Sequence, residues 1–285
     1  MHTHQSQLPH QSPIPFITDG GLETTLVFLE KLDLPCFAAF PLLNAADGRE
    51  TLRRYYRTYA ELAVRFGAGF ILESPTWRAN PDWAAKLGYT PAALESVNRD
   101  AIDLMREIQA EFETPATPFI ISGCLGPRGD GYQVGTAMTR EQAARYHAPQ
   151  IRTYRDAGAD IVTAVTMTYV EEALGIADAA GVLEIPSVIS FTVETDGRLP
   201  SGQTLREAIA FVDAKAARAP AYYMINCAHP THFASELTAG ASWLSRIVGL
   251  RANASCRSHA ELDESSSLDA GNPAELGMQY RQLRE

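Results

Sequence analysis

The stretch Phe70-Ile71-Leu72-Glu73-Ser74 contains the pattern on which the fold depends. Three consecutive large hydrophobic residues are typical of a parallel β-strand that is buried on both faces, and two polar residues follow them directly. A strand of this kind needs a covering layer on each face, and helices usually provide both layers. The stretch therefore predicts one strand of an α/β fold, with polar side chains at its carboxyl end.

The same pattern recurs along the chain, with amphipathic segments between its occurrences. The predicted strands are Phe16–Thr18, Phe70–Glu73, Phe119–Ser122, Ile161–Val165, Ser187–Phe191, Tyr222–Asn226 and Arg246–Leu250. A hydrophobic stripe at helical spacing in residues 49–66, and capping-box spacing after Thr139 and Thr204, mark three of the helices between them. Strands that alternate with helices, without a break in composition, predict a single α/β domain.

Alternation alone does not distinguish a TIM-type (β/α)8 barrel from a doubly wound sheet. The chain has no G-x-G-x-x-G after its first predicted strand and no Walker A motif. Nearly every predicted strand ends in polar or glycine residues, and barrel enzymes build their sites from such strand ends. We therefore expect a TIM-type barrel. Only seven strands are predicted and the chain ends inside the seventh helix, so strand 8 and helix 8 are expected to be missing.

Composition excludes several classes of function. With 285 residues, 46% of them hydrophobic, the chain can bury a sizeable core, and its net charge of −10 argues against nucleic-acid or acidic-membrane partners. No apolar run is long enough to span a membrane, and four widely spaced cysteines suggest reduced thiols in a cytoplasmic protein. We expect residues 1–15 to be a disordered leader and residues 16–285 to form the barrel domain.

Three segments carry the candidate chemistry. Asp19-Gly20-Gly21 places a carboxylate beside flexible backbone, and Glu73-Ser74-Pro75-Thr76-Trp77 offers a carboxylate, two hydroxyls and an indole. Asn226-Cys227 places a thiol at a strand end, where its thiolate can ligate zinc, and His229 and His232 follow. Each segment alone also has a structural explanation, as a turn, a loop or a buried small hydrophobe with helix-capping histidines.

Together these segments resemble the homocysteine S-methyltransferase family, also called the homocysteine-binding domain, and in particular a bacterial branch of it. The family has Asp-Gly-Gly after strand one, a Glu-Thr-Asn-Thr-Phe-like segment after strand two and Asn-Cys after strand six. Gly123-Cys124-Leu125-Gly126-Pro127 resembles its Gly-Ser-Leu-Gly-Pro after strand three, and the resemblance covers residues 16–285 in consistent order. It implies transfer of a methyl group from S-methylmethionine, betaine or a related donor to the zinc-bound thiolate of homocysteine, which forms methionine.

The resemblance also implies the roles of individual residues. Cys227 would be a catalytic residue and a zinc ligand. The implied substrate-binding residues are Asp19, Gly20, Gly21, Glu73, Ser74, Thr76 and Asn226. The expected partners are small molecules, namely homocysteine and a methyl donor, and a homo-oligomer is compatible with this function.

The sequence departs from the family pattern in two ways. Val165 stands where much of the family has a glutamate after strand four, and Glu194 is a candidate substitute. The family's Gly-Gly-Cys-Cys segment at strand eight, which supplies the other two zinc ligands, does not occur. We expect the chain to be truncated before that motif. A rebuilt site, in which Cys256 and His259 join Cys227, is the alternative.

Two other classes of function compete with a methyltransferase. One is an amino-acid-binding barrel without catalysis, or an inactive fragment that lacks the full zinc site. The other is a Schiff-base lyase or aldolase, which needs a lysine at the carboxyl end of a strand. Lys31, Lys86 and Lys215 are the only lysines, and none of them follows a predicted strand, so the sequence argues against the second class.

Overall fold

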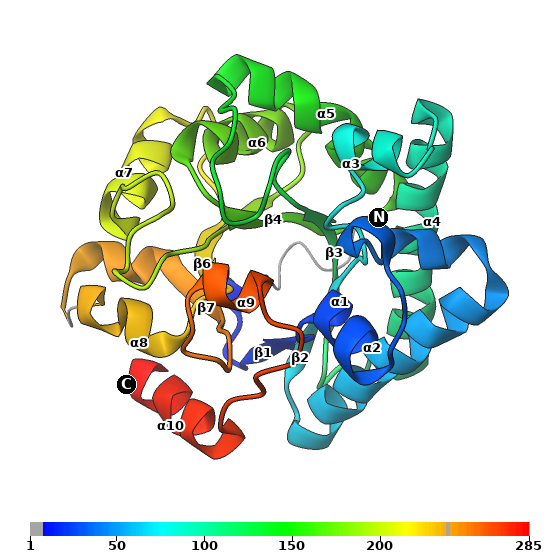
Figure 1. The fold of residues 1–285 in the computed structure, drawn as a ribbon, viewed down its shortest axis with the longest axis horizontal. Helices are drawn as coiled ribbons and strands as arrows, with labels where there is room; N and C mark the ends of the chain where they lie inside the picture. Colours follow the sequence, from blue (N-terminus) through cyan, green and yellow to red (C-terminus); the bar gives the residue numbers. More distant parts are fainter. Residues whose placement is uncertain (1–7, 238–239, 285) are drawn as a thin grey trace.

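A computed structural model describes residues 8–237 and 240–284. In this part of the chain, seven parallel strands form one sheet in sequential order, which curves into a nearly closed barrel (Figure 1). The strands are β1 (Phe16–Thr18), β2 (Gly69–Glu73), β3 (Phe119–Leu125), β4 (Ile161–Met167), β5 (Ser187–Phe191), β6 (Tyr222–Asn226) and β7 (Ile247–Arg251). β1 and β7 are the two edges of the sheet.

Helices surround the barrel and follow its strands in turn (Figure 1). The longer helices are α2 (Ala46–Phe66), α4 (Pro91–Phe112), α5 (Arg140–Ala157), α6 (Val170–Val182), α7 (Leu205–Lys215) and α10 (Pro273–Arg284). The shorter ones are α1 (Leu22–Thr24), α3 (Pro81–Lys86), α8 (Pro230–Phe233) and α9 (His259–Asp263). Short 3-10 or π turns occur at Pro9–Gln11, Thr25–Leu29, Pro35–Phe37, Phe40–Asn44, Ala234–Glu236 and Ser242–Arg246. Within the described residues, no helix is both long and apolar enough to cross a lipid bilayer.

The predicted fold class is confirmed. The order β1 to β7 is that of a TIM-type barrel without its eighth unit, whereas a doubly wound sheet would reverse its strand order partway. The helix signals also hold, because the side chains of Thr139 and Thr204 cap α5 and α7 in capping boxes, as their spacing predicts. The last strand lies one residue later than expected, at Ile247–Arg251 instead of Arg246–Leu250.

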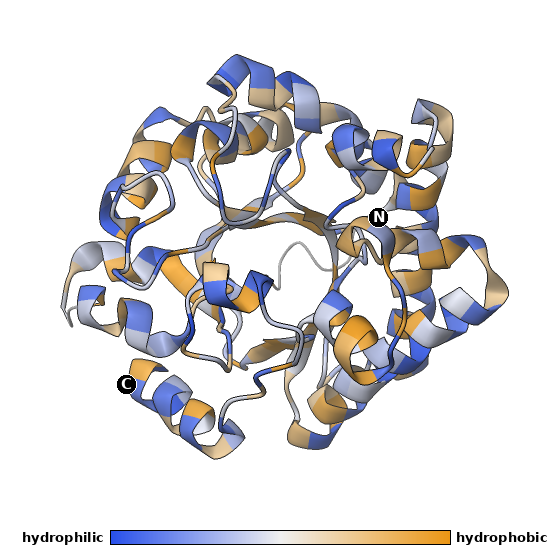
Figure 2. Cartoon of the chain, in the orientation of Figure 1, coloured by the Kyte–Doolittle hydropathy of each residue, from blue (hydrophilic) through white to orange (hydrophobic). Residues whose placement is uncertain are grey.

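Side chains of successive strand residues point alternately toward the helices and into the barrel. Phe70 and Leu72 belong to the large core between strands and helices, whereas Ile71 belongs to a smaller core inside the barrel. The buried members of this inner core are Leu8, Ile71, Ile120, Ile161, Val188, Tyr222 and Met224. Hydrophobic residues dominate the strands, while hydrophobic and hydrophilic positions alternate along the outer helices (Figure 2). Above the inner core, the inward positions of the strands carry polar groups.

An irregularity in β7 decides which of its residues face inward. Tyr223 pairs with Ile247, but the next residue, Met224, pairs with Gly249, so β7 holds one extra residue at this point. Ile247 and Leu250 therefore both pack against the outer core, although they are three positions apart. Arg251 consequently pairs with Asn226, on the inward face of the barrel. Without the extra residue, its side chain would point toward the helices.

The predicted disordered leader does not hold for residues 8–15, while residues 1–7 lie outside the described residues. Leu8 is buried in the inner core, and Pro9–Gln11 forms a short 3-10 helix beside it. The ring of His10 lies 5.5 Å from that of Tyr222. The physical reason is that the amino end of a barrel exposes apolar side chains, and this segment covers them. The segment is mostly polar in composition, so the sequence did not indicate that Leu8 packs into the inner core.

We expect Leu8→Ala to lower the free energy of unfolding by about 2–4 kcal/mol, because it removes a buried side chain from the inner core. Leu29→Ala is the matched control. Leu29 is 63% exposed, so its truncation should change stability by less than about 0.5 kcal/mol. Urea unfolding of the two variants and the unmodified chain measures both effects. Equal stability of Leu8→Ala and the unmodified chain would show that the segment does not seal the barrel.

Candidate active site

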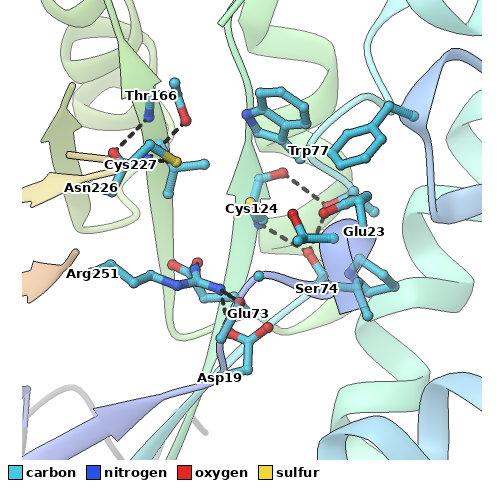
Figure 3. A pocket seen from close by; sticks show the side chains of 18 of the residues that line it. Asp19, Glu23, Glu73, Ser74, Trp77, Cys124, Thr166, Asn226, Cys227 and Arg251 are labelled. Atoms are coloured by element: carbon cyan, nitrogen blue, oxygen red, sulfur yellow. Dashed lines mark hydrogen bonds and ion pairs between the residues drawn. The ribbon is translucent and has the colours of Figure 1, made fainter. Parts of the chain in front are cut away.

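A cavity of about 190 Å³ opens at the carboxyl ends of the strands (Figure 3). All eight residues that the sequence predicts for the site line it: Asp19, Gly20, Gly21, Glu73, Ser74, Thr76, Asn226 and Cys227. They come from β2, from β6 and from the loops that follow β1, β2 and β6. The fold therefore brings the three chemical segments together in one place. Their individual roles remain predictions.

Two of the predicted substrate-binding hydroxyls are bonded within the protein. The Oγ atom of Ser74 lies 2.7 Å from Oγ1 of Thr76, and it accepts a hydrogen bond of 2.9 Å from the backbone N–H of Cys124. Thr76 in turn donates to the carbonyl oxygen of Cys124 over 2.9 Å. Both hydroxyls are buried. They join the loop after β2 to β3, so they shape the cavity wall and present little surface to a ligand.

Asn226 determines where the Cys227 thiol lies. Its side-chain oxygen accepts hydrogen bonds from the backbone N–H of Thr166 over 2.9 Å and from the hydroxyl of Ser190 over 2.6 Å. Its Nδ2 donates to Oγ1 of Thr166 and, over 3.2 Å, to Sγ of Cys227. Thr166 and Cys227 have φ angles of 62° and 56°, in the left-handed region that residues other than glycine rarely adopt. Such backbone strain often marks functional sites.

An arginine that the sequence reading missed bridges the mouth of the barrel. The Arg251 guanidinium donates from Nη2 to Oδ1 of Asp19 over 2.8 Å and to the carbonyl oxygen of Gly20 over 2.6 Å. Its Nη1 forms an ion pair with Glu73. Figure 3 shows the arginine between the two carboxylates. It thus links β7 to β1 and β2 across the side of the barrel where β7 and β1 do not pair.

Burial shifts the pKa values of the carboxyl groups that line the cavity. It raises the pKa of Asp19 to about 6, although Arg251 opposes this rise, while Glu73 adds to it. Burial also raises the pKa of Glu23 to about 7. The pKa of the Cys124 thiol lies well above its ordinary value for the same reason, so this thiol stays protonated at neutral pH. The cavity therefore contains two carboxyl groups that titrate near neutrality.

Glu23, Cys124, Tyr132 and Arg251 line the cavity without having been predicted for the site. Cys124 lies in a segment quoted for the resemblance, at the end of a predicted strand, while Glu23 follows Asp19-Gly20-Gly21 closely in the sequence; these positions were the available signal. Arg251 directly follows the predicted seventh strand, so the same signal applied to it. Tyr132 comes from the loop between β3 and α5, and no local pattern marked it.

Helix α9 lies over the mouth of the barrel, where His259 is buried (Figure 1). The ring of His259 stacks on that of Tyr132 with centroids 4.0 Å apart. Its Nε2 bonds to the carbonyl oxygen of Cys227, and its Nδ1 lies 3.3 Å from Oε1 of Glu194. Glu194 therefore contacts α9. Val165 lines the cavity, whereas Glu194, the candidate substitute for the family's glutamate, is not among the residues that line it.

The described residues do not assemble a metal site. Within residues 8–237 and 240–284, no group of three or more His, Cys, Asp or Glu side chains could hold a metal ion. The alternative set of Cys227, Cys256 and His259 is therefore not formed: Cys256 is exposed, and both ring nitrogens of His259 have partners. Cys227 stays the predicted zinc ligand, and the residues around it do not by themselves fit a zinc ion.

Fold and site together define a barrel protein whose cavity lies at its strand ends, and comparisons with known proteins identify the family. The homocysteine S-methyltransferase family matches residues 16–282. The chain belongs to this family.

Individual relatives are distant. A selenocysteine Se-methyltransferase of Brassica oleracea var. italica is 25% identical over 220 residues, which are 70% of this chain and 61% of that protein. A homocysteine S-methyltransferase of Escherichia coli K12 is 25% identical over 174 residues, 58% of this chain and 53% of that protein. The chain thus matches between half and two thirds of the length of these relatives.

Solved structures agree on the fold. The metallated form of the homocysteine methyltransferase MmuM from Escherichia coli superposes with a TM-score of 0.64 at 19% identity, over 79% of this chain and 78% of that one. Its oxidized form gives a TM-score of 0.65 at 19% identity, over 79% and 77%. At this level of identity the likeness establishes the fold alone.

The raised pKa of Glu23 predicts a pH-dependent stability. The carboxyl group binds its proton more tightly in the folded state, with a pKa of about 7, than at its ordinary value of 4.5. The free energy of unfolding should therefore fall by on the order of 3 kcal/mol as the pH rises from about 4.5 to 7. Glu23→Gln should lack this part of the fall.

Urea unfolding at several pH values between 4.5 and 7.5 measures the difference. Glu95→Gln is the control, because Glu95 is exposed on α4 and should leave the pH profile unchanged. A Glu23→Gln variant that loses as much stability with rising pH as the unmodified chain would contradict the prediction.

Zinc analysis tests the metal prediction. A tight zinc site needs about three or four protein ligands, so we expect the 285-residue chain to hold well under one zinc ion per molecule after dialysis. Plasma emission spectroscopy of the purified protein gives the ratio. Stoichiometric zinc that Cys256→Ser removes would instead support the set of Cys227, Cys256 and His259.

Proposed function

We propose that this protein transfers a methyl group to the thiol of homocysteine, or of a closely related amino acid, at the cavity on the barrel mouth. The donor would be S-methylmethionine, betaine or a related cationic methyl compound. One observation carries the proposal: in a chain of this family, Asp19-Gly20-Gly21, Glu73 to Thr76 and Asn226-Cys227 converge on a single cavity. The named relatives act on homocysteine and selenocysteine, which agrees with a thiol or selenol acceptor.

The reaction forms a bond between the acceptor sulfur and the methyl carbon and breaks the bond between that carbon and the donor's sulfonium or ammonium centre. The donor leaves as a neutral thioether or amine, and the acceptor thiol releases its proton. Glu23 lines the cavity, and its pKa of about 7 lets its carboxylate accept this proton near neutral pH. Holding both reactants in line supplies much of the acceleration.

The walls of the cavity suit these reactants. The indole of Trp77 lines the cavity and offers an aromatic face for a methylated cation. Tyr132 and α9 cover the opening, which reduces the access of water. Zinc would hold the acceptor as a thiolate, but the described residues do not complete a zinc site.

A non-catalytic amino-acid-binding barrel is the second candidate. The observation in its favour is that the described residues include no three-ligand metal group, although the cavity at the barrel mouth is formed. Homocysteine binding without methionine formation would support it.

We expect slow methionine formation from homocysteine and S-methylmethionine, and a fall of at least about tenfold in Cys227→Ser, because this thiol lines the cavity and is the proposed catalytic residue. Chromatographic measurement of methionine, together with calorimetric binding of homocysteine, separates turnover from binding. Cys256→Ser is the control, since Cys256 is exposed and outside the cavity. Equal rates in the unmodified chain and Cys227→Ser would refute the assigned role of Cys227.

A further inference from the structure

The two carboxylates at the base of the cavity already have a cationic partner. Arg251 contacts Asp19 and Glu73, and the side chains of these acids are only 3% and 4% exposed. The other oxygen of Asp19 accepts a hydrogen bond of 3.1 Å from the hydroxyl of Tyr55. A substrate ammonium group would have to displace the guanidinium to reach either acid. We therefore do not expect Asp19 and Glu73 to bind the substrate's amino group.

Arg251 itself keeps hydrogen-bonding capacity for a ligand. A guanidinium has five N–H groups. Three of them donate to Asp19, Gly20 and Glu73, so, counting the described residues, Nε–H and one hydrogen on Nη1 remain. The arginine side chain is 21% exposed and lines the cavity. The carboxylates thus act as supports that orient a charged donor toward the ligand.

A bulge in β7 places this arginine. The extra residue in β7 turns Arg251 from the helix side to the inside of the barrel, next to Asn226. Gly249, the preceding inward position, lies against Met224, where a Cβ atom would come within 3.0 Å of that side chain. The bulge and the glycine together bring the arginine into the cavity, although β7 is the least buried of the later strands. Bulges of this kind often re-aim a side chain at a functional site.

We propose that Arg251 recognises the α-carboxylate of the amino-acid acceptor and so determines which thiols the site accepts, with Asp19 and Glu73 as positioning residues. This inference rests on the proposed function. Arginine suits the task, because a hydrogen bond from a guanidinium to a carboxylate is charge-assisted and therefore strong. The site then distinguishes amino-acid thiols from simple thiols by their carboxylate, and it reads the ammonium group only weakly.

Calorimetry with three thiols tests this assignment: homocysteine, 3-aminopropanethiol, which lacks the carboxylate, and 4-mercaptobutanoate, which lacks the ammonium group. The unmodified chain should bind 4-mercaptobutanoate within about threefold of homocysteine, and 3-aminopropanethiol at least about tenfold more weakly. In Arg251→Met, homocysteine and 3-aminopropanethiol should bind within about threefold of each other. Arg251→Lys should show an intermediate preference. Arg257→Met, at an exposed arginine in the loop after β7, is the matched control and should keep the full preference.

A second variant separates recognition from folding. Arg251→Met alone leaves two buried carboxylates without their cation, so the triple variant Asp19→Asn, Glu73→Gln, Arg251→Met serves where the single variant does not fold. Loss of the carboxylate preference in either folded variant supports the proposal. If the preference persists in them, or if the unmodified chain binds 3-aminopropanethiol as tightly as homocysteine, Arg251 is only a structural bridge. If none of the three thiols binds, the proposed function fails together with this inference.

Discussion

The alternation of side chains along seven parallel strands is the constraint on which the rest of the structure depends. Each strand must give one set of side chains to the helices and the other to the barrel interior, and all strands end at the same rim. The interior is hydrophobic around Ile71 and Ile120 and becomes polar toward the rim, at Glu73 and Asn226. The hydrophobic inner core, which stabilises the barrel, therefore lies below the polar cavity along the barrel axis.

The buried charges show how this arrangement is sustained. Two carboxylates in a low-dielectric interior lose their hydration and, to a lesser extent, repel each other, which raises the pKa of Asp19. Arg251 offsets both costs and at the same time ties β7 to β1 and β2, across the side of the barrel where β7 and β1 do not pair. One side chain thereby serves both the closure of the mouth and the electrostatics of the cavity.

The polar residues of the rim divide into supports and groups that face a ligand. Ser74, Thr76 and Asn226 direct their hydrogen bonds at neighbouring backbone, at side chains and at the Cys227 thiol. Glu23 and Arg251 keep capacity toward the cavity. Membership in the homocysteine S-methyltransferase family accounts for the segments that converge here, whereas the division of labour among them follows from the geometry of this chain.

The sequence by itself determined the strand order, the helix caps and the three segments that meet at the mouth. These depend on local hydrophobicity, on hydrogen bonds between residues three apart and on the rule that parallel strands end on one side. Tertiary structure alone decided the orientation of Arg251, because a one-residue bulge reverses side-chain direction and leaves no sign in the hydrophobic pattern. It also decided that Leu8 seals the barrel and that His259 and Tyr132 cover the cavity, since these contacts join residues far apart in the chain.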